Sequence, residues 1–219
     1  MADAELPLPM SALDIADWRL KTFALYAEVR ERAAADPAGA HRLWRERRDT
    51  MFGSHPASAL DSTKKAGFSG LAVAPYDPAF RFRVALDGEG AGERMEVETG
   101  TDGVVPFVRL GTFDVPEVGR LAAWELKSYG GGIFLPFRDA TAGKPGGSYG
   151  AGRYLLDTVK GAFHGTDADG GTPTFILDFN FAYNPSCAYN EYWACPLPGP
   201  ANRVPASVTA GEMYLPELA

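Results

Sequence analysis

The 219-residue sequence has few of the residues on which several common protein classes depend. It contains two cysteines and three histidines, too few for a disulfide-stapled scaffold or for an evident zinc site. No stretch approaches the roughly 18 consecutive apolar residues of a membrane-spanning helix. Lysine and arginine total 21 against 28 aspartates and glutamates. The net charge of −7 argues against a nucleic-acid partner, because phosphate backbones are bound by concentrated positive charge.

The N-terminal sequence also lacks the features of a secretory signal. Residues 1–18 have no basic start, no apolar core and no small-residue cleavage site. We therefore expect a cytoplasmic protein without a membrane partner, in which the cysteines are reduced. Residues 1–10 contain prolines and are expected to be loose, ahead of a single domain that spans residues 11–219.

Two stretches near the N-terminus have the apolar periodicity of helices. Apolar residues recur every three or four positions over 15–29, and Asp36 followed by Pro37 is a favourable start for a second helix. We predict helices over about 14–53. The basic run at 45–48 is expected to lie mostly in solvent.

From about residue 80 the apolar period changes from helical to alternating. Glycine (25) and proline (17) are abundant, which favours short strands and turns. Residues 80–99 alternate around the turn sequence DGEGAGE and predict a β-hairpin. Further strands are expected near 104–110, 120–127, 133–138, 153–159 and 174–183. The pattern indicates a mainly β (α+β) fold, an antiparallel barrel or sandwich of about seven or more short strands over 68–219, preceded by two helices.

Several familiar motifs occur in surroundings that do not fit the corresponding sites. In GGSYG, Ser148 precedes a strand rather than the helix of a nucleophile elbow, and His164 is the only histidine downstream. GKPGGSYGAG lacks the helix of a phosphate-binding loop, and DADGG at 167–171 lacks the third ligand of a calcium loop. Cys187 and Cys195 do not have the spacing of a zinc site. We expect two free thiols, with a disulfide or redox pair and a metal site as alternatives.

The stretch TFILDFNFAY, residues 174–183, places polar groups within an apolar strand. Alternation predicts that one face is core and that the other carries Asp178 and Asn180 between apolar neighbours. The residues expected on the core face are Phe175, Leu177, Phe179 and Phe181. If the protein is a catalyst, Asp178 is the expected general base, since apolar neighbours raise the pKa of a carboxyl group. A structural polar pair is the alternative.

A second polar segment surrounds a glycine-rich turn, in FRDATAGKPGGSYGAGRYLLD, residues 137–157. Two of its arginines, Arg138 and Arg153, would together form a clamp for a carboxylate or phosphate. The structural alternative pairs Arg153 with Asp157 on the same strand face.

These segments resemble a known family. FLPFRDATAG followed by SYGAGRYL, and LDFNFAYNPSCAYN followed by CPLPGPANRVPASVTAGE, are similar to the bacterial and archaeal family catalogued as domain of unknown function 1684. The similarity spans roughly 14–214 and is concentrated in 134–212. The family pattern has threonine in place of Ser148, which further disfavours a serine nucleophile. The resemblance implies no reaction, but it makes the arginine-, asparagine- and cysteine-bearing segments family features.

Two functions are compatible with these observations. The first is a small-molecule-binding protein, or an enzyme, that holds an anionic carboxylate or phosphate ligand in a polar pocket. Its expected lining residues are Arg138, Asp139, Tyr149, Arg153, Asp178, Asn180, Asn184 and Glu212. The second is a non-catalytic binding or scaffolding module whose polar residues form internal networks. The sequence indicates no metal ligands and demands no flavin, and the cofactor is left unassigned.

Overall fold

The computed structural model describes residues 12–99, 103–167, 173–191, 193 and 195–218. Three helices come first: α1 (Ala12–Ala33), α2 (Pro37–Ser54) and α3 (Ser62–Ala66). Eight strands follow: β1 (Arg81–Asp87), β2 (Arg94–Thr99), β3 (Gly103–Val115), β4 (Gly119–Leu126), β5 (Ile133–Phe137), β6 (Arg153–Asp157), β7 (Thr166–Asp167) and β8 (Thr174–Asp178). The segment 1–10, predicted to be loose, lies outside the described residues.

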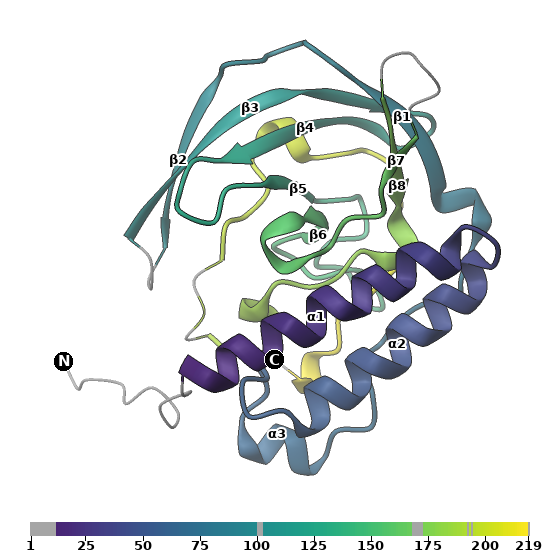
Figure 1. Cartoon of the computed structure of the whole chain (residues 1–219), viewed down its shortest axis with the longest axis vertical. Helices are drawn as coiled ribbons and strands as arrows, with labels where there is room; N and C mark the ends of the chain where they lie inside the picture. Colours follow the sequence, from purple (N-terminus) through teal and green to yellow (C-terminus); the bar gives the residue numbers. More distant parts are fainter. Residues whose placement is uncertain (1–11, 100–102, 168–172, 192, 194, 219) are drawn as a thin grey trace.

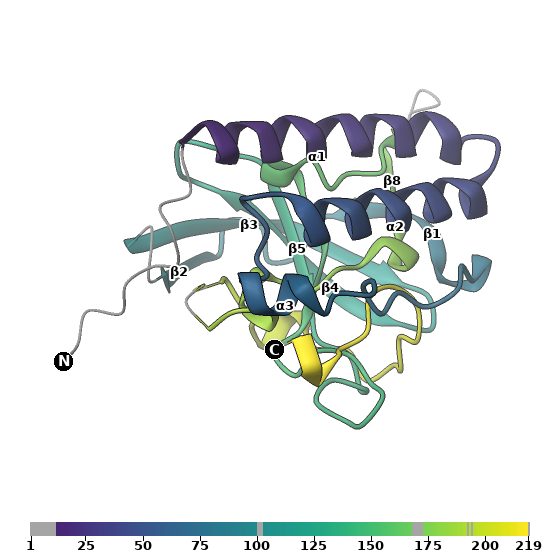
Figure 2. The ribbon, with the colours of Figure 1, turned by 90° about the horizontal axis from the view of Figure 1, so that it is seen from below.

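Helices α1 and α2 form a pair that lies side by side along one side of the sheet (Figure 2). The predicted start of α2 is confirmed, because the Asp36 side chain caps the helix by accepting a hydrogen bond of 2.8 Å from the backbone N–H of Gly39. The prediction for the basic run is wrong at Arg48, which is 9% exposed. Trp44, Arg48 and Phe52 are spaced four residues apart and share the buried face of α2. No helix in the described part of the chain is long and apolar enough to cross a membrane.

The eight strands form one antiparallel sheet with the order β6-β5-β4-β3-β1-β8-β7, and β2 pairs with β3 beside this path. The sheet arches over the interior of the molecule (Figure 1). The sheet is not closed into a barrel, because the described residues of the two end strands, β6 and β7, do not pair with each other. An isolated bridge from Tyr154 to Tyr183 links β6 to the chain just after β8. The predicted antiparallel β-rich fold with two N-terminal helices is therefore confirmed, as an open barrel or sandwich.

The hairpin predicted over 80–99 is wrong. β1 pairs with β8 and with the C-terminal end of β3, whereas β2 pairs with the N-terminal part of β3. The two strands thus follow one another along the same edge of β3, where its register with β4 shifts between Arg109 and Gly111. Gly111 has φ 157°, and a Cβ there would lie 1.9 Å from the carbonyl oxygen of Asp87. A glycine is therefore required where β1 approaches β3.

Strand β4 separates two apolar clusters, because its alternate residues face opposite sides. Leu121 and Ala123 belong to one cluster, and Ala122 and Trp124 belong to the other. The Trp124 side includes residues from both long helices, among them Tyr26, Val29, Trp44 and Phe52. The Leu121 side lies among the strands and the C-terminal segment, and includes Phe113, Leu135, Phe179, Val204 and Val208. Both faces of the sheet's centre are therefore buried.

The strand predicted over 174–183 ends early, at Asp178, and continues as a 3-10 turn, η3 (Phe179–Phe181). The turn places Phe181 in a different apolar cluster from Phe175, Leu177 and Phe179, so the predicted common face is wrong at Phe181. Phe179 is fully buried and packs edge-on against Phe82 and Phe137, with ring centroids 5.8 and 5.1 Å away.

Replacing Phe179 with alanine is expected to lower the free energy of unfolding by about 3–5 kcal/mol, because a large buried ring is removed from a close-packed cluster. Urea unfolding followed by circular dichroism measures this change. Tyr129→Ala is the matched control, since Tyr129 is fully exposed and its removal is expected to change stability little. An unchanged unfolding midpoint for Phe179→Ala would contradict the packing described above.

Candidate functional site

The eight residues predicted to line a pocket lie in three places. Four surround the turn between β5 and β6, two lie at the end of β8, and two lie between the segment after β8 and the C-terminal segment. In this order they are Arg138, Asp139, Tyr149 and Arg153; Asp178 and Asn180; Asn184 and Glu212. The first and third groups touch where Arg153 donates to the backbone oxygen of Glu212 at 3.2 Å. Only Asn184 lines the cleft described below.

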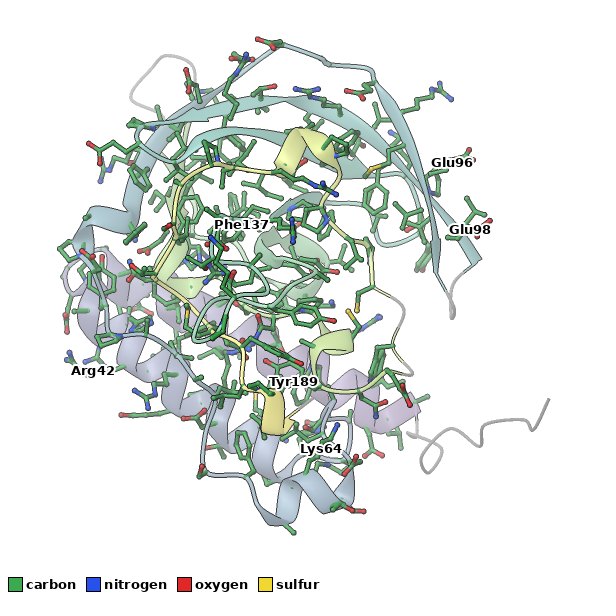
Figure 3. The ribbon with its side chains drawn as sticks, turned by 180° about the vertical axis from the view of Figure 1, so that it is seen from behind. Arg42, Lys64, Glu96, Glu98, Phe137 and Tyr189 are labelled. Carbon is green, nitrogen blue, oxygen red and sulfur yellow. The ribbon has the colours of Figure 1, made fainter. Side chains whose placement is uncertain are left out.

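Arg153 is fully buried and ties β6 to the C-terminal segment. Its guanidinium donates to the carbonyl oxygens of Ala210 at 2.6 Å and Val208 at 2.8 Å, and lies 3.3 Å from the Asp139 carboxylate. It also stacks 4.9 Å above the ring centroid of Phe137, which is labelled in Figure 3. These contacts make Arg153 a cross-link between segments far apart in the sequence.

The carboxylate that pairs with Arg153 is Asp139, so the predicted pairing with Asp157 is wrong. Asp139 also accepts hydrogen bonds from the hydroxyls of Thr141 at 2.6 Å and Ser148 at 2.5 Å. Burial opposes ionisation of Asp139, but the charge of Arg153 and these hydrogen bonds outweigh it and hold its pKa below the ordinary value. Ser148, rejected above as a nucleophile, thus serves to bind the Asp139 carboxylate.

Arg138 and Tyr149 flank this network without joining it. Arg138 is half-buried and donates through Nε to the carbonyl oxygen of Gly150 at 2.8 Å. Tyr149 donates to the carbonyl oxygen of Cys187 at 3.3 Å, and burial raises the pKa of its hydroxyl. The two arginines predicted to act as one clamp are therefore engaged by different partners.

Asp178 and Asn180 form a second closed network at the end of β8. The buried Asp178 carboxylate accepts from Arg81 at 2.7 Å and from the Asn180 side chain at 2.8 Å. Asn180 also bonds both backbone groups of Asp77, at 2.7 and 2.8 Å. Burial raises the pKa of Asp178, against the lowering effects of Arg81 and Asn180. A raised pKa is what was expected if Asp178 acted as a general base. The hydrogen-bond partners of its carboxylate, however, are protein groups that fix a turn.

The third group adjoins a cleft between the helix pair and the chain that follows β8. The cleft has a cavity volume of about 80 Å³ and is partly open to solvent. Helices α1 and α2 form one wall, and the 3-10 turn η2 (Thr158–Lys160) and residues 183–186 form the other. The lining residues are Trp18, Thr22, Leu25, Tyr26, Arg48, Met51, Phe52, Lys160, Tyr183, Asn184 and Ser186.

Arg48 is the buried cation of this cleft. Its Nη2 atom lies 2.7 Å from the Glu212 carboxylate, and its guanidinium stacks 4.7, 5.0 and 5.2 Å from the ring centroids of Trp44, Phe52 and Tyr183. Such cation–π contacts favour a desolvated guanidinium. The aromatic rings therefore hold Arg48 in one orientation beside the cleft.

Glu212 is the counter-ion of Arg48 and is itself fully buried. It accepts from the backbone N–H of Asn184 at 3.1 Å and from the Tyr189 hydroxyl. Tyr189, labelled in Figure 3 next to Lys64, is fixed in turn by a 2.6 Å bond from Lys64 Nζ to its carbonyl oxygen. Burial raises the pKa of Glu212, against the lowering effect of Arg48.

Two residues that line the cleft each have a buried polar atom without a hydrogen-bond partner among the described residues. These atoms are Nε of Arg48, a donor, and Oδ1 of Asn184, an acceptor. The orientation of Asn184 follows from its Nδ2 atom, which donates to the carbonyl oxygen of Met213 at 3.1 Å. A buried polar atom without a partner costs about 1–3 kcal/mol. A donor and an acceptor of two cleft-lining residues are therefore left unsatisfied in the described part of the chain.

A hydrogen-bonded carboxylate also lies behind the opposite wall. The Tyr183 hydroxyl donates to Asp157 at 3.0 Å, and Lys160 approaches the same carboxylate at 3.3 Å. Burial raises the pKa of Tyr26, another lining residue, to about 12, so its hydroxyl stays protonated. In the described part of the chain no three His, Cys, Asp or Glu side chains are grouped as metal ligands.

Four residues in or next to the cleft were not predicted from the sequence as site residues: Arg48, Tyr26, Tyr189 and Lys160. A signal was available for Arg48, because its four-residue spacing from Trp44 and Phe52 places it on the buried stripe of α2. Tyr189 and Lys160 lie in 3-10 turns and short loops. Such segments have no regular apolar period from which the buried side chains could be predicted. The segment DADGG at 167–171, rejected as a calcium loop, lies mostly outside the described residues.

Comparison with known families identifies the chain. Residues 66–213 match the family described as "Protein of unknown function (DUF1684)". The chain belongs to the DUF1684 family. Within the cleft, Lys160, Tyr183 and Asn184 come from the DUF1684 region, whereas Arg48 and the residues of α1 precede it.

A solved structure is also similar to this DUF1684 protein. It is the solution NMR structure of an uncharacterized protein from gene locus rrnAC0354 of Haloarcula marismortui. The two chains are 29% identical, with a TM-score of 0.55 over 83% of this chain and 96% of the other. No curated protein matches the sequence.

Arg153→Ala is expected to lower the free energy of unfolding by about 3–5 kcal/mol, because it strands the Asp139 carboxylate in the interior. Arg153→Lys is expected not to restore stability, since a single ammonium cannot replace the planar guanidinium between a carboxylate and two carbonyls. Urea unfolding measures both. Arg83→Ala, which removes an ion pair with a largely exposed arginine, is the control and is expected to have little effect. A stable Arg153→Ala protein would reject the structural role.

Glu212 is expected to make stability depend on pH. Its raised pKa means that the folded protein binds this proton more tightly than the unfolded chain, so this contribution to stability falls as pH rises from the ordinary value of 4.5 through the folded-state pKa. Glu212→Gln lacks this titration and should gain stability relative to the parent across that window. Denaturant unfolding between pH 4 and 8 measures the difference. Glu98→Gln, on exposed β2, is the control, and a parallel pair of curves for Glu212→Gln and parent would contradict the expectation.

Proposed function

We propose that this protein binds a small organic anion in the cleft beside Arg48. The observation that carries the proposal is that two lining residues each have a buried polar atom without a partner among the described residues, Nε of Arg48 and Oδ1 of Asn184. Both atoms are buried in this structure, so we infer that the two side chains turn toward the cleft when it binds an acid that also carries a hydroxyl, amine or amide N–H, and that such an acid then satisfies both atoms. Its acidic oxygen accepts from Arg48 while its own donor meets Asn184.

The charges of the lining side chains support an anionic ligand. Arg48 and Lys160 are the charged residues among those that line the cleft, and both are cationic. Their counter-ions, Glu212 and Asp157, lie behind the wall rather than in it. A ligand in the cleft therefore meets the cations first. A guanidinium binds carboxylate and phosphate alike, so both are candidate acidic groups.

The remainder of the cleft suits an apolar part of the ligand. Trp18, Leu25, Met51 and Phe52 present aromatic and aliphatic surface from the two helices. A cleft with a largely apolar lining and a few convergent polar groups is typical of small-molecule sites. The ligand that fits is small, with one acidic end and one apolar end.

The networks around Asp139 and Asp178 support the scaffolding alternative for their own residues only. Each of these carboxylates is enclosed by protein donors that join distant segments. We assign them a structural role and place binding at the third group. This keeps Asn184 and Glu212 from the predicted set and adds Arg48 and Lys160.

The proposal can be tested by filling the cleft with a larger side chain. Thr22 lines the cleft, and within the described residues its hydroxyl bonds to the carbonyl oxygen of Trp18 in its own helix and to no other group, so Thr22→Trp occupies the space without breaking a network there. Ala27→Trp adds the same side chain at an exposed position of α1 and is the matched control. Isothermal titration calorimetry with a panel of hydroxy acids, amino acids, simple carboxylates and phosphate monoesters measures binding.

We expect saturable binding of at least one acid by the parent and by Ala27→Trp, and a loss of about tenfold or more with Thr22→Trp. Arg48→Lys should weaken binding by roughly ten- to a hundredfold, because it keeps the charge and removes the Nε donor. Binding that is unaffected by Thr22→Trp would place the ligand elsewhere. A parent that binds no acid of the panel would reject the proposal.

A further inference from the structure

Helix α1, which lies along one margin of the molecule (Figure 2), has apolar side chains that the described part of the chain leaves uncovered. One face of the helix, with Leu25, Tyr26 and Val29, is buried. Four of the seven large apolar side chains that are exposed among the described residues nevertheless belong to α1. They are Leu13, Ile15, Leu20 and Phe23. Exposed apolar side chains that gather on one element, rather than occurring singly, mark an interaction surface.

Two of these side chains begin a stripe along the exposed side of α1. Leu13 and Leu20 are seven residues apart and are 81% and 70% exposed. Ala24 and Ala27 continue the same side of the helix, because steps of three, four and seven residues return to one face, and both are exposed. We call these four residues the α1 stripe. Its N-terminal half has large side chains, and its C-terminal half has small ones.

Charged residues beside the α1 stripe alternate in sign along the helix. In chain order they are Asp17, Lys21, Glu28 and Arg32, and their side chains are between 47% and 53% exposed. Lys21 and Glu28 are equally far from the middle of this series, and so are Asp17 and Arg32. Reversing the direction of the helix therefore reverses the sign at every one of these positions.

The ion pairs within one chain do not commit Lys21 and Glu28. Lys21 lies 2.5 Å from Asp17, and Glu28 lies 3.9 Å from Arg47 of α2. All four side chains are more than half exposed, and ion pairs in such surroundings are weak because water screens them. Both charges are therefore available to a partner that covers the helix.

A hollow beside the α1 stripe provides space for side chains of such a partner. It lies between α1 and α2 and has a cavity volume of about 270 Å³. Its lining includes Lys21, Ala24 and Glu28 of α1, and Arg47, Thr50 and Ser54 of α2. The two charged residues that flank the stripe thus lie at the edge of this hollow.

We propose that the α1 stripe pairs with the α1 stripe of a second copy of this chain, with the two helices antiparallel across a two-fold axis near Ala24. In this arrangement Lys21 of each copy lies opposite Glu28 of the other. Asp17 of each copy likewise lies opposite Arg32 of the other. The leucines of one N-terminal half pack on the alanines of the other C-terminal half. A parallel pair would instead place Lys21 beside Lys21 and leucine on leucine.

A second copy is favoured as the partner because this surface is complementary to itself. A two-fold axis brings the same patch of both copies together, so every contact occurs twice. The charges and the side-chain sizes of α1 both meet that condition when the helices are antiparallel. This chain therefore carries both halves of a matching surface, and its partner needs no further feature.

The pairing is independent of the ligand proposed for the cleft. Trp18 and Thr22 of α1 line the cleft, whereas Lys21, Ala24 and Glu28 line the hollow. The binding control Ala27→Trp adds a large ring to the α1 stripe, so it should weaken the dimer without filling the cleft. Failure of the binding experiment leaves the dimer intact, and failure of the dimer leaves the binding site intact.

Exchanging the charges of Lys21 and Glu28 tests the pairing. Size-exclusion chromatography with light scattering measures the mass over a range of concentrations, and the parent is expected to reach twice the chain mass of 23.5 kDa. Lys21→Glu and Glu28→Lys each place like charges opposite one another twice in a dimer, so each should weaken dimerisation by about tenfold or more. An equimolar mixture of the two variants should dimerise again, because each contact then joins an acidic and a basic side chain.

Leu20→Gln tests the apolar part of the surface without changing its charge. It should be monomeric but remain folded by circular dichroism, since Leu20 is exposed in the single chain. Val104→Gln, at an exposed apolar position of β3, is the matched control and should dimerise like the parent. A parent that is monomeric at every concentration would overturn the proposal and leave the α1 stripe to a different partner. A dimer that survives Leu20→Gln and the single charge changes would also overturn it, as would single variants that do not recover on mixing.

Discussion

The carboxylate of Glu212 joins the three parts of the molecule that would otherwise have little reason to meet. It accepts from Arg48 of α2, from the backbone of Asn184 after β8 and from the Tyr189 hydroxyl. A carboxylate taken fully out of water must have such partners, because its desolvation penalty is several kcal/mol. The position of the helix pair against the sheet, and with it the shape of the cleft, therefore depends on this one buried charge.

The backbone before Glu212 shows how tightly that position is fixed. Gly211 has φ 81°, and a Cβ there would lie 2.6 Å from the carbonyl oxygen of Phe179 and 2.8 Å from that of Ala182. Only glycine allows the chain to pass this close. The backbone N–H of Glu212 donates to the carbonyl oxygen of Ala182 at 2.8 Å. The carbonyl oxygen of Glu212 accepts a hydrogen bond from Arg153. The side chain thus points to the helices while the backbone is held by the sheet.

The architecture was largely predictable from the sequence, and the contacts between distant segments were not. Helix starts and strands follow from local rules, and the predicted Asp36 cap and the strand predicted near 120–127 were correct. The predicted hairpin of β1 and β2 was wrong, because a turn sequence indicates a change of chain direction but not which strands pair. The common face of Phe179 and Phe181 failed because a 3-10 turn replaces the two-residue period at Asp178.

The candidate site illustrates the same limit in its chemistry. The sequence does not distinguish an arginine that binds a ligand from an arginine that pairs with a carboxylate in another segment of the chain. Asp139, Asp178 and Glu212 are all buried, and each pairs with an arginine that lies 14, 97 or 164 residues away. What separates the third pair is the cleft beside it, which only the folded arrangement reveals, because among the described residues Nε is buried and unpaired in Arg153 as well as in Arg48.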